Sequence, residues 1–88
     1  MNNKTVIFDK QFRDDLRWWC KKDKKISERV FNLVEDTIAN PFEGIGKPEN
    51  LKYFSGSKWS RKITQEHRLV YQVSDQKIIF LQCRYHYQ

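Results

Sequence analysis

The residues that interrupt secondary structure are concentrated in one segment of this chain. Both prolines and all three glycines of its 88 residues lie between Pro41 and Gly56, within NPFEGIGKPENLKYFSG. Because proline and glycine break helices and strands, we expect an ordered loop here, with one short strand near 51–54. Its glycines match neither a phosphate-binding loop nor a dinucleotide fingerprint. A loop of this length in so small a domain indicates a functional role.

Before the loop, the spacing of apolar residues predicts one strand and two helices. The run TVIF, residues 5 to 8, predicts a strand, and Asp9 is placed to cap the helix that follows. Asp23 then caps a second helix, which Pro41 ends. With about one residue between them, the helices are expected to form an antiparallel hairpin. The first is predicted to bury Phe12, Leu16, Trp19 and Cys20, and the second Ile26, Val30, Leu33, Val34, Thr37 and Ile38.

After the loop, three runs rich in β-branched and aromatic residues predict strands. These runs are KWSRKIT, EHRLVYQVS and KIIFLQCRYHY, the last two joined through 74–77. We therefore predict a single domain over residues 1–88 of the α+β class. It would consist of an N-terminal strand, a two-helix antiparallel hairpin and then a twisted antiparallel sheet of three to four strands.

One face of each of the last two strands must pack against the helices, because side chains alternate between the faces of a strand. In the first of these strands the core face is predicted to carry Leu69, Tyr71 and Val73. In the second, the more apolar and less charged face is predicted to carry Ile79, Leu81, Cys83 and Tyr85.

Matching these core faces requires opposed residue numbers with an even sum, such as Tyr71 opposite Leu81. A three-residue turn over 75–77 gives that register. On the neighbouring strand, either Arg61 or Lys62 points to the face that the helices leave open. A two-residue turn over 75–76 makes the sum odd and places Arg68 and His86 on opposite faces of the sheet. The even register gathers on the open face Arg68, Arg84 and His86.

The chain carries a net charge of +6, from 17 Lys and Arg against 11 Asp and Glu. Residues 44–88 hold eight basic and three acidic side chains, so most of the excess lies in this half. Concentrated positive charge among aromatic residues favours nucleic acid as a partner, with an acidic protein as the alternative. Aromatic side chains that can stack on bases are Tyr53 and Tyr87, and also Tyr85 and Trp59, which are equally expected in the core.

The cysteines and the apolar runs argue against several other classes of protein. Cys20 and Cys83 lie far apart with no His at ligand spacing, so neither a zinc site nor a disulfide framework is expected. Both thiols are predicted to be reduced and buried. No apolar stretch is long enough for a signal peptide or a membrane span, so a cytoplasmic protein is expected. No metal or other cofactor is predicted.

The basic face has the groups needed to cleave RNA without a metal. RNA carries its own nucleophile, the 2′-hydroxyl, so the protein needs a base, cations for the phosphorane charge and an acid for the leaving oxygen. Glu49 can take the proton, and His86 can protonate the 5′ oxygen because its reference pKa is ~6.5. Taken singly, each residue also fits the solvated face of an ordinary sheet. The phosphate-binding candidates are Lys52, Arg68 and either Arg61 or Lys62.

Long blocks of the chain resemble one family. NPFEGIGKPENLK, WSRKITQEHRLVYQV and CRYHY, with DKKI and LVEDT of the second helix, are similar to the signature blocks of the Txe/YoeB toxins of the RelE-like superfamily. The resemblance covers nearly the whole chain and implies a RelE-like microbial RNase fold. It further implies a ribosome-dependent endoribonuclease that cuts messenger RNA in the A site of the 70S ribosome, where it would contact ribosomal RNA. A Phd/YefM-type antitoxin would neutralise it.

The resemblance also implies roles for individual residues. The family's general base falls on Glu49, its phosphate-binding arginine on Arg68 and its general acid on His86. Lys52 and Tyr87 match supporting positions.

The chain departs from the family at two places, and several alternatives stay open. Lys62 replaces the usual second arginine after WS, which keeps the charge but loses the bidentate fork, and Gln88 extends the end. Arg84 either binds phosphate or only contributes to the positive electrostatic field of the basic face. Homodimer formation is left open. The alternative function is a non-catalytic module that binds RNA or the ribosome.

Overall fold

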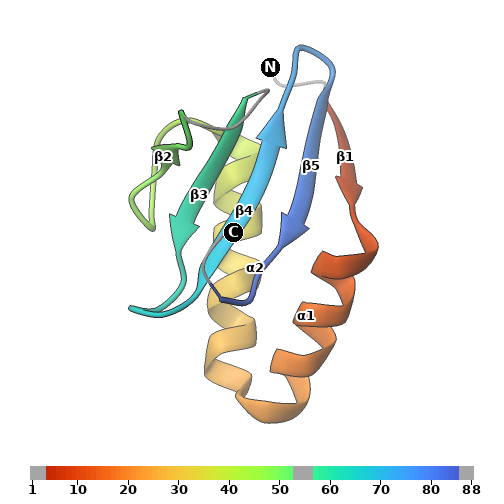
Figure 1. Cartoon of the computed structure of the whole chain (residues 1–88), viewed down its shortest axis with the longest axis vertical. Helices are drawn as coiled ribbons and strands as arrows, with labels where there is room; N and C mark the ends of the chain where they lie inside the picture. Colours follow the sequence, from red (N-terminus) through yellow and green to blue (C-terminus); the bar gives the residue numbers. More distant parts are fainter. Residues whose placement is uncertain (1–3, 53–56, 86–88) are drawn as a thin grey trace.

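The chain folds into a five-stranded sheet with two helices packed against it (Figure 1). The computed structural model describes residues 4–52 and 57–85. None of the helices in these ranges is long and apolar enough to cross a membrane. The elements in chain order are β1 (Thr5–Phe8), α1 (Lys10–Lys22), α2 (Lys24–Ala39), β2 (Glu49–Asn50), β3 (Lys58–Lys62), β4 (Arg68–Val73) and β5 (Lys77–Gln82).

The sheet has the strand order β1-β5-β4-β3-β2, so the first strand of the chain and the loop strand form its two edges. Strands β2 to β5 pair antiparallel, as predicted, and the α+β class is confirmed. β1 pairs parallel to β5 and makes the sheet mixed. The loop strand occupies Glu49–Asn50, just before the predicted 51–54, of which residues 53 and 54 lie outside the described part of the chain.

A single aspartate joins the two helices. Asp23 ends α1, where its backbone N–H donates to the Trp19 carbonyl, and begins α2, where its side chain accepts from the N–H groups of Lys25 and Ile26. One linking residue allows only a tight hairpin, which confirms the prediction. Asp9 stands at the start of α1, but its side chain makes no cap bond within the described residues.

The core lies between the helices and one face of the sheet. All six positions predicted for the second helix are buried or pack against the core. In α1, Cys20 is exposed, contrary to the prediction, because it lies one residue beyond the core-facing Trp19 and thus about 100° around the helix. Asp15 is buried instead, and its Oδ2 accepts from the Cys83 N–H at 3.0 Å. Cys83 is buried as predicted, and this burial raises the pKa of its thiol.

The predicted register between β4 and β5 is wrong next to the turn. The turn is the two-residue alternative, closed by a 2.9 Å hydrogen bond from the Ser74 N–H to the Lys77 carbonyl. Tyr71 therefore lies opposite Phe80 rather than Leu81. The core face of this part of β5 carries Ile78 and Phe80, both fully buried, so the predicted core positions Ile79 and Leu81 are also wrong.

A β-bulge then restores the even register at the far end of the strands. The pairing shifts between Tyr71 and Val70, and Val70 lies opposite Gln82. An extra residue in one strand exchanges the two faces beyond it. Cys83 consequently returns to the core cluster, as predicted, while Gln82 shares the open face with Val70.

Candidate active site

Strand alternation decides which basic residue of β3 faces outward. Arg61 lies opposite the buried core residue Leu69, and Lys62 lies opposite Arg68. Opposed residues of an antiparallel pair project to the same side, so Lys62 and Arg68 emerge together on the face away from the helices. The choice that the sequence left open between Arg61 and Lys62 is thereby resolved in favour of Lys62.

Glu49 joins the same face through the loop strand. It lies opposite Ser60, Ser60 lies opposite Val70, and Val70 lies opposite Gln82. These four residues form one row across four strands. From the usual strand spacing and rise, the Cα atoms of Glu49 and Arg68 lie about 12 Å apart. Extended Glu and Arg side chains can bridge that separation through one phosphate group. Ser60 and Gln82 were missed by the sequence analysis, because only the observed pairing places them in this row.

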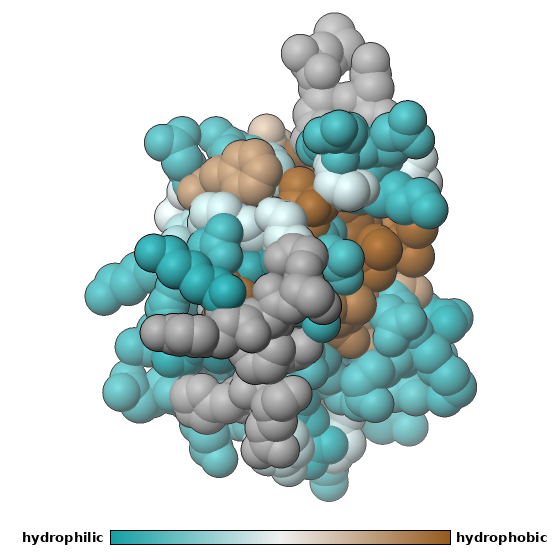
Figure 2. All heavy atoms as spheres, turned by 45° about the horizontal axis from the view of Figure 1, so that its top comes forward, coloured by the Kyte–Doolittle hydropathy of each residue, from teal (hydrophilic) through white to brown (hydrophobic). Residues whose placement is uncertain are grey.

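Polar and apolar residues occupy different parts of this sheet face. Figure 2 shows hydrophobic atoms gathered on the right, the side on which Figure 1 draws β5 and β1, and mainly hydrophilic residues on the left, the side of β2 and β3. By register, Ile7 lies opposite Ile79 on the open face. Glu49 on β2, Lys62 on β3 and Arg68 on β4 lie on the three strands farthest from β1.

Arg68 is anchored by the hairpin that precedes it. Its Nη1 donates to the Thr64 carbonyl at 3.0 Å, and its backbone N–H donates to the Tyr85 carbonyl at 3.1 Å. The side chain is only half-buried. One donor of the guanidinium is therefore used to orient the group.

The β3–β4 hairpin is held in turn by helix α2 and by the loop. Arg29 donates from Nε to the Ile63 carbonyl at 3.0 Å and from Nη2 to the Lys62 carbonyl at 2.9 Å. The Lys62 N–H donates to the Gly46 carbonyl at 2.6 Å. These backbone contacts fix the point from which the Lys62 side chain leaves the sheet.

Arg61 is a structural residue, so its predicted role in phosphate binding is wrong. Its side chain is fully buried, and Nη1 forms a 2.6 Å ion pair with Asp36 Oδ2. Nε donates to the Tyr71 hydroxyl at 3.2 Å. The remaining donors bind carbonyl groups of the loop, namely Asn40 at 2.6 Å, Glu43 at 3.0 Å and Ile45 at 3.1 Å.

The Arg61 contacts shape the loop that leads to Glu49. Asp36 also accepts from the Ile45 N–H at 2.9 Å, and the hydrogen bond from Arg61 holds the pKa of the Asp36 carboxyl below its usual value. Gly44 has a φ of 128°, and a Cβ there would collide with the Asp36 carboxylate. The ion pair of the buried Arg61 with Asp36 and this glycine thus fix the loop on its inner side.

The side chain of Arg84 lies against helix α1. Its guanidinium carbon is 3.6 Å from the centroid of the Trp18 ring, and its Nη2 donates to the Tyr85 hydroxyl at 2.8 Å. The prediction that Arg84 joins the open face is therefore wrong. The Trp18 ring supplies a cation–π contact that strand alternation does not reveal.

The other predicted residues have varied surroundings. Trp59 is partly buried and packs against the core, and its ring contacts that of Phe42 with centroids 5.1 Å apart and planes inclined at 53°. Tyr85 and Lys52 are exposed. Four of the residues singled out from the sequence lie outside the described residues: Tyr53, His86, Tyr87 and Gln88.

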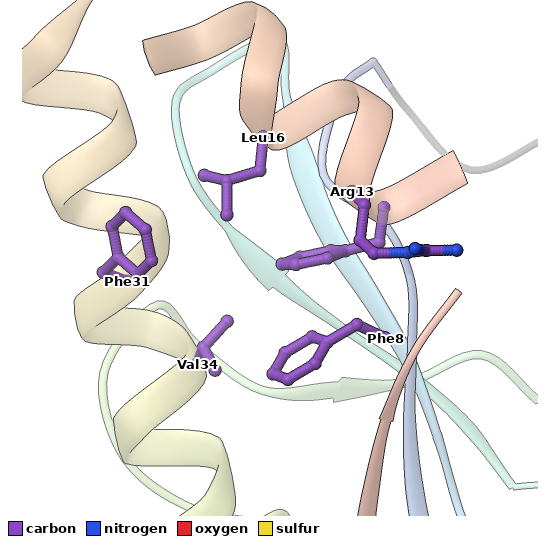
Figure 3. Close-up of a pocket in the computed structure, with 6 residues that line it drawn as sticks. Phe8, Arg13, Leu16, Phe31 and Val34 are labelled. Atoms are coloured by element: carbon purple, nitrogen blue, oxygen red, sulfur yellow. The ribbon is translucent and has the colours of Figure 1, made fainter. Parts of the chain in front are cut away.

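A groove on the helix side is chemically unlike the candidate site. It has a volume of about 230 Å³ and lies between α1, α2 and the end of β1 (Figure 3). The guanidinium of Arg13 points away from it, while Phe8, Leu16, Phe31 and Val34 surround it. Its lining is thus apolar and offers no group for binding phosphate.

Comparison with known proteins places the chain in a family. The family model described as "YoeB-like toxin of bacterial type II toxin-antitoxin system" matches residues 8–87. Toxin YoeB of Escherichia coli strain K12 is 46% identical over 82 residues, which cover 93% of this chain and 98% of the relative.

Solved structures agree with this assignment. A YoeB dimer from Staphylococcus aureus has a TM-score of 0.83 at 38% identity, covering 97% of this chain and 99% of that one. A heterotetrameric YoeB-YefM toxin-antitoxin complex from the same organism has a TM-score of 0.80 at 40% identity, covering 96% and 98%. The chain belongs to the YoeB-like toxins of bacterial type II toxin-antitoxin systems.

Proposed function

We propose that this toxin is a ribosome-dependent endoribonuclease that cleaves messenger RNA in the A site of the 70S ribosome and so inhibits translation. The observation that carries the proposal is the shared face of Glu49, Lys62 and Arg68, which register places together on adjacent strands. A carboxylate and two cations on one face of the sheet suit phosphodiester cleavage. Membership of the YoeB-like toxins supports the same assignment.

The proposed reaction uses the 2′-hydroxyl of the messenger as its nucleophile. Glu49 takes the hydroxyl proton while the oxygen attacks the adjacent phosphorus. Arg68 and Lys62, with Lys52, stabilise the extra negative charge of the phosphorane. His86 then gives a proton to the departing 5′ oxygen. The products are a 2′,3′-cyclic phosphate and a free 5′-hydroxyl, so protons and bonds balance without a cofactor.

The charge distribution supports the proposed partners. Residues 44–88 carry eight basic and three acidic side chains, which favours contact with messenger and ribosomal RNA. A Phd/YefM-type antitoxin is the proposed inhibitor, with an acidic segment that covers the basic face. The YoeB toxin from Staphylococcus aureus forms a complex with YefM, which supports this choice.

Cleavage of messenger on translating 70S ribosomes tests the proposal. The parent is expected to cut, and Glu49→Gln and His86→Gln are each expected to lose activity by about 10²–10⁴-fold, the usual worth of a positioned acid or base. Glu35→Gln, an exposed change on α2, serves as the control and keeps full activity. A parent that binds ribosomes without cutting would establish the alternative, a non-catalytic binding module.

Restoring the family's arginine at Lys62 should increase activity. Lys62→Arg places a bidentate donor opposite Arg68, and one additional hydrogen bond of about 1 kcal/mol corresponds to about fivefold in rate. Single-turnover cleavage on ribosomes measures the effect. Lys77→Arg is the matched control. Lys77 begins β5, at the end of the sheet away from the Lys62–Arg68 pair, so the change is expected to leave the rate unchanged. Equal rates for the two variants would show that Lys62 does not contact the reacting phosphate.

A further inference from the structure

The last described residues of the chain are held by groups from other elements. The Cys83 N–H donates to Asp15 Oδ2 at 3.0 Å, and the Cys83 carbonyl accepts from Trp19 Nε1 at 2.8 Å. Both partners belong to α1, and both are buried. The first residue of the C-terminal turn, defined here as Cys83–Tyr85, is thus fixed through both of its backbone polar groups.

The other end of the C-terminal turn is fixed in the same way. The Tyr85 N–H donates to Nδ1 of His67 at 2.7 Å, and the Tyr85 carbonyl accepts from the Arg68 N–H at 3.1 Å. Tyr85 has a φ of 63°, in the left-handed region that non-glycine residues rarely adopt. Such a conformation persists where surrounding contacts enforce it, and these two hydrogen bonds are such contacts.

The hydrogen bond from the Tyr85 N–H determines the tautomer of neutral His67. An imidazole nitrogen that accepts a hydrogen bond carries no proton, so the proton of neutral His67 is on Nε2. Nε2 lies 3.8 Å from the Glu66 carboxylate. The ring stands edge-on to Trp19 with centroids 4.8 Å apart, and its side chain is 12% exposed. Packing therefore holds the ring in the orientation that accepts from the Tyr85 N–H.

We infer that His67 is a positioning residue for the C-terminal acid of the reaction, an inference that rests on the proposed function. His86 follows Tyr85 directly in the sequence, so Tyr85 is the last described residue before the proposed acid. The neighbouring Arg68 binds the same turn through its N–H. His67 thus holds the residue that precedes the proton donor in the sequence against the backbone of the phosphate-binding arginine. A misplacement of about 1 Å can cost about 10²-fold in rate.

A nearly isosteric pair of variants isolates the hydrogen bond. His67→Asn keeps an acceptor close to the position of Nδ1, whereas His67→Leu has almost the same shape and no acceptor. We expect His67→Leu to lower kcat on ribosome-bound messenger by about 10–100-fold with KM within about twofold, and His67→Asn to recover most of that loss. Equal kcat values for the two variants, or a parental kcat for His67→Leu, would overturn the inference.

Two further measurements separate this effect from misfolding and from failure of the proposed function. Thermal melting and antitoxin binding verify that the variants are folded, and His67→Phe, which keeps the ring on Trp19, replaces His67→Leu if the latter is not. His86→Gln is assayed in parallel. If it cleaves like the parent, the proposed general acid is wrong, and so is the role of His67. If it is inactive while the folded variant without an acceptor cleaves normally, only the positioning role is wrong.

Discussion

Replacing Arg61 by methionine is expected to lower the free energy of unfolding by about 3–5 kcal/mol. The change removes the buried guanidinium that binds Asp36, the Tyr71 hydroxyl and three loop carbonyl groups, so these acceptors lose their partner. Small domains have only about 5–15 kcal/mol of stability, so the loss is a large part of it. Urea unfolding followed by tryptophan fluorescence measures the change.

Two companion variants define the Arg61 result. Arg61→Lys keeps the charge but lacks the planar set of donors, so it should recover only a small part of the loss. Arg17→Met, whose side chain is 71% exposed on α1, is the control and should change stability by less than about 0.5 kcal/mol. An Arg61→Met midpoint in urea equal to that of the parent would refute the structural role.

The Asp36 partner adds a pH dependence of known sign. Hydrogen bonding from Arg61 lowers the pKa of Asp36 in the folded protein. Its carboxylate therefore contributes stability that is present above the unfolded value of ~3.9 and is lost as the pH falls through the folded value. Below about pH 4 the parent should lose stability more steeply than Asp36→Asn. Parallel acid melting curves for the two proteins would contradict the ion pair.

Replacing Arg68 by glutamine is expected to reduce cleavage by about 10²–10³-fold, the usual cost of removing one donor to a developing oxyanion. The residue is half-buried, and its side-chain hydrogen bonds go to carbonyl groups of its own hairpin, those of Thr64 and His67, so folding should be nearly unaffected. Single-turnover rates at saturating toxin measure the chemical step. Arg17→Gln, on the exposed side of α1, is the charge-matched control. An Arg68→Gln rate within twofold of the parent would show that Arg68 does not stabilise the reacting phosphate.

The helices and the succession of elements along the chain could be predicted, because each depends on local signals, whereas the parallel pairing of β1 with β5 was not predicted. Periodic apolar residues, the capping Asp23 and the cluster of glycine and proline act within a few residues of one another. The register of β5 could not be predicted in the same way. Four consecutive apolar residues, from Ile78 to Leu81, make both of its faces apolar, so alternation does not distinguish them. The turn and a bulge decide the register instead.

In the candidate site, too, contacts between residues far apart in the sequence could not be predicted. Neighbouring Arg61 and Lys62 carry the same charge, and only their pairing with Leu69 and Arg68 shows that one is buried and the other faces outward. The ion-pair partner of the buried Arg61 is Asp36, which comes from a distant helix. Likewise, Arg84 was expected on the open face, and its position is set by Trp18, which no strand pattern reveals. Long-range partners of buried charges are therefore what sequence reasoning missed.

The most direct test of the account is cleavage of a messenger that carries a single 2′-deoxynucleotide immediately 5′ to the scissile phosphate, placed in the ribosomal A site. Cutting at this bond is expected to stop, because the attacking oxygen is absent, while the all-ribose messenger is cut at the same codon. Binding to the ribosome should be unchanged. Continued cutting at the deoxy position would contradict the internal-nucleophile mechanism and the roles assigned to Glu49 and His86.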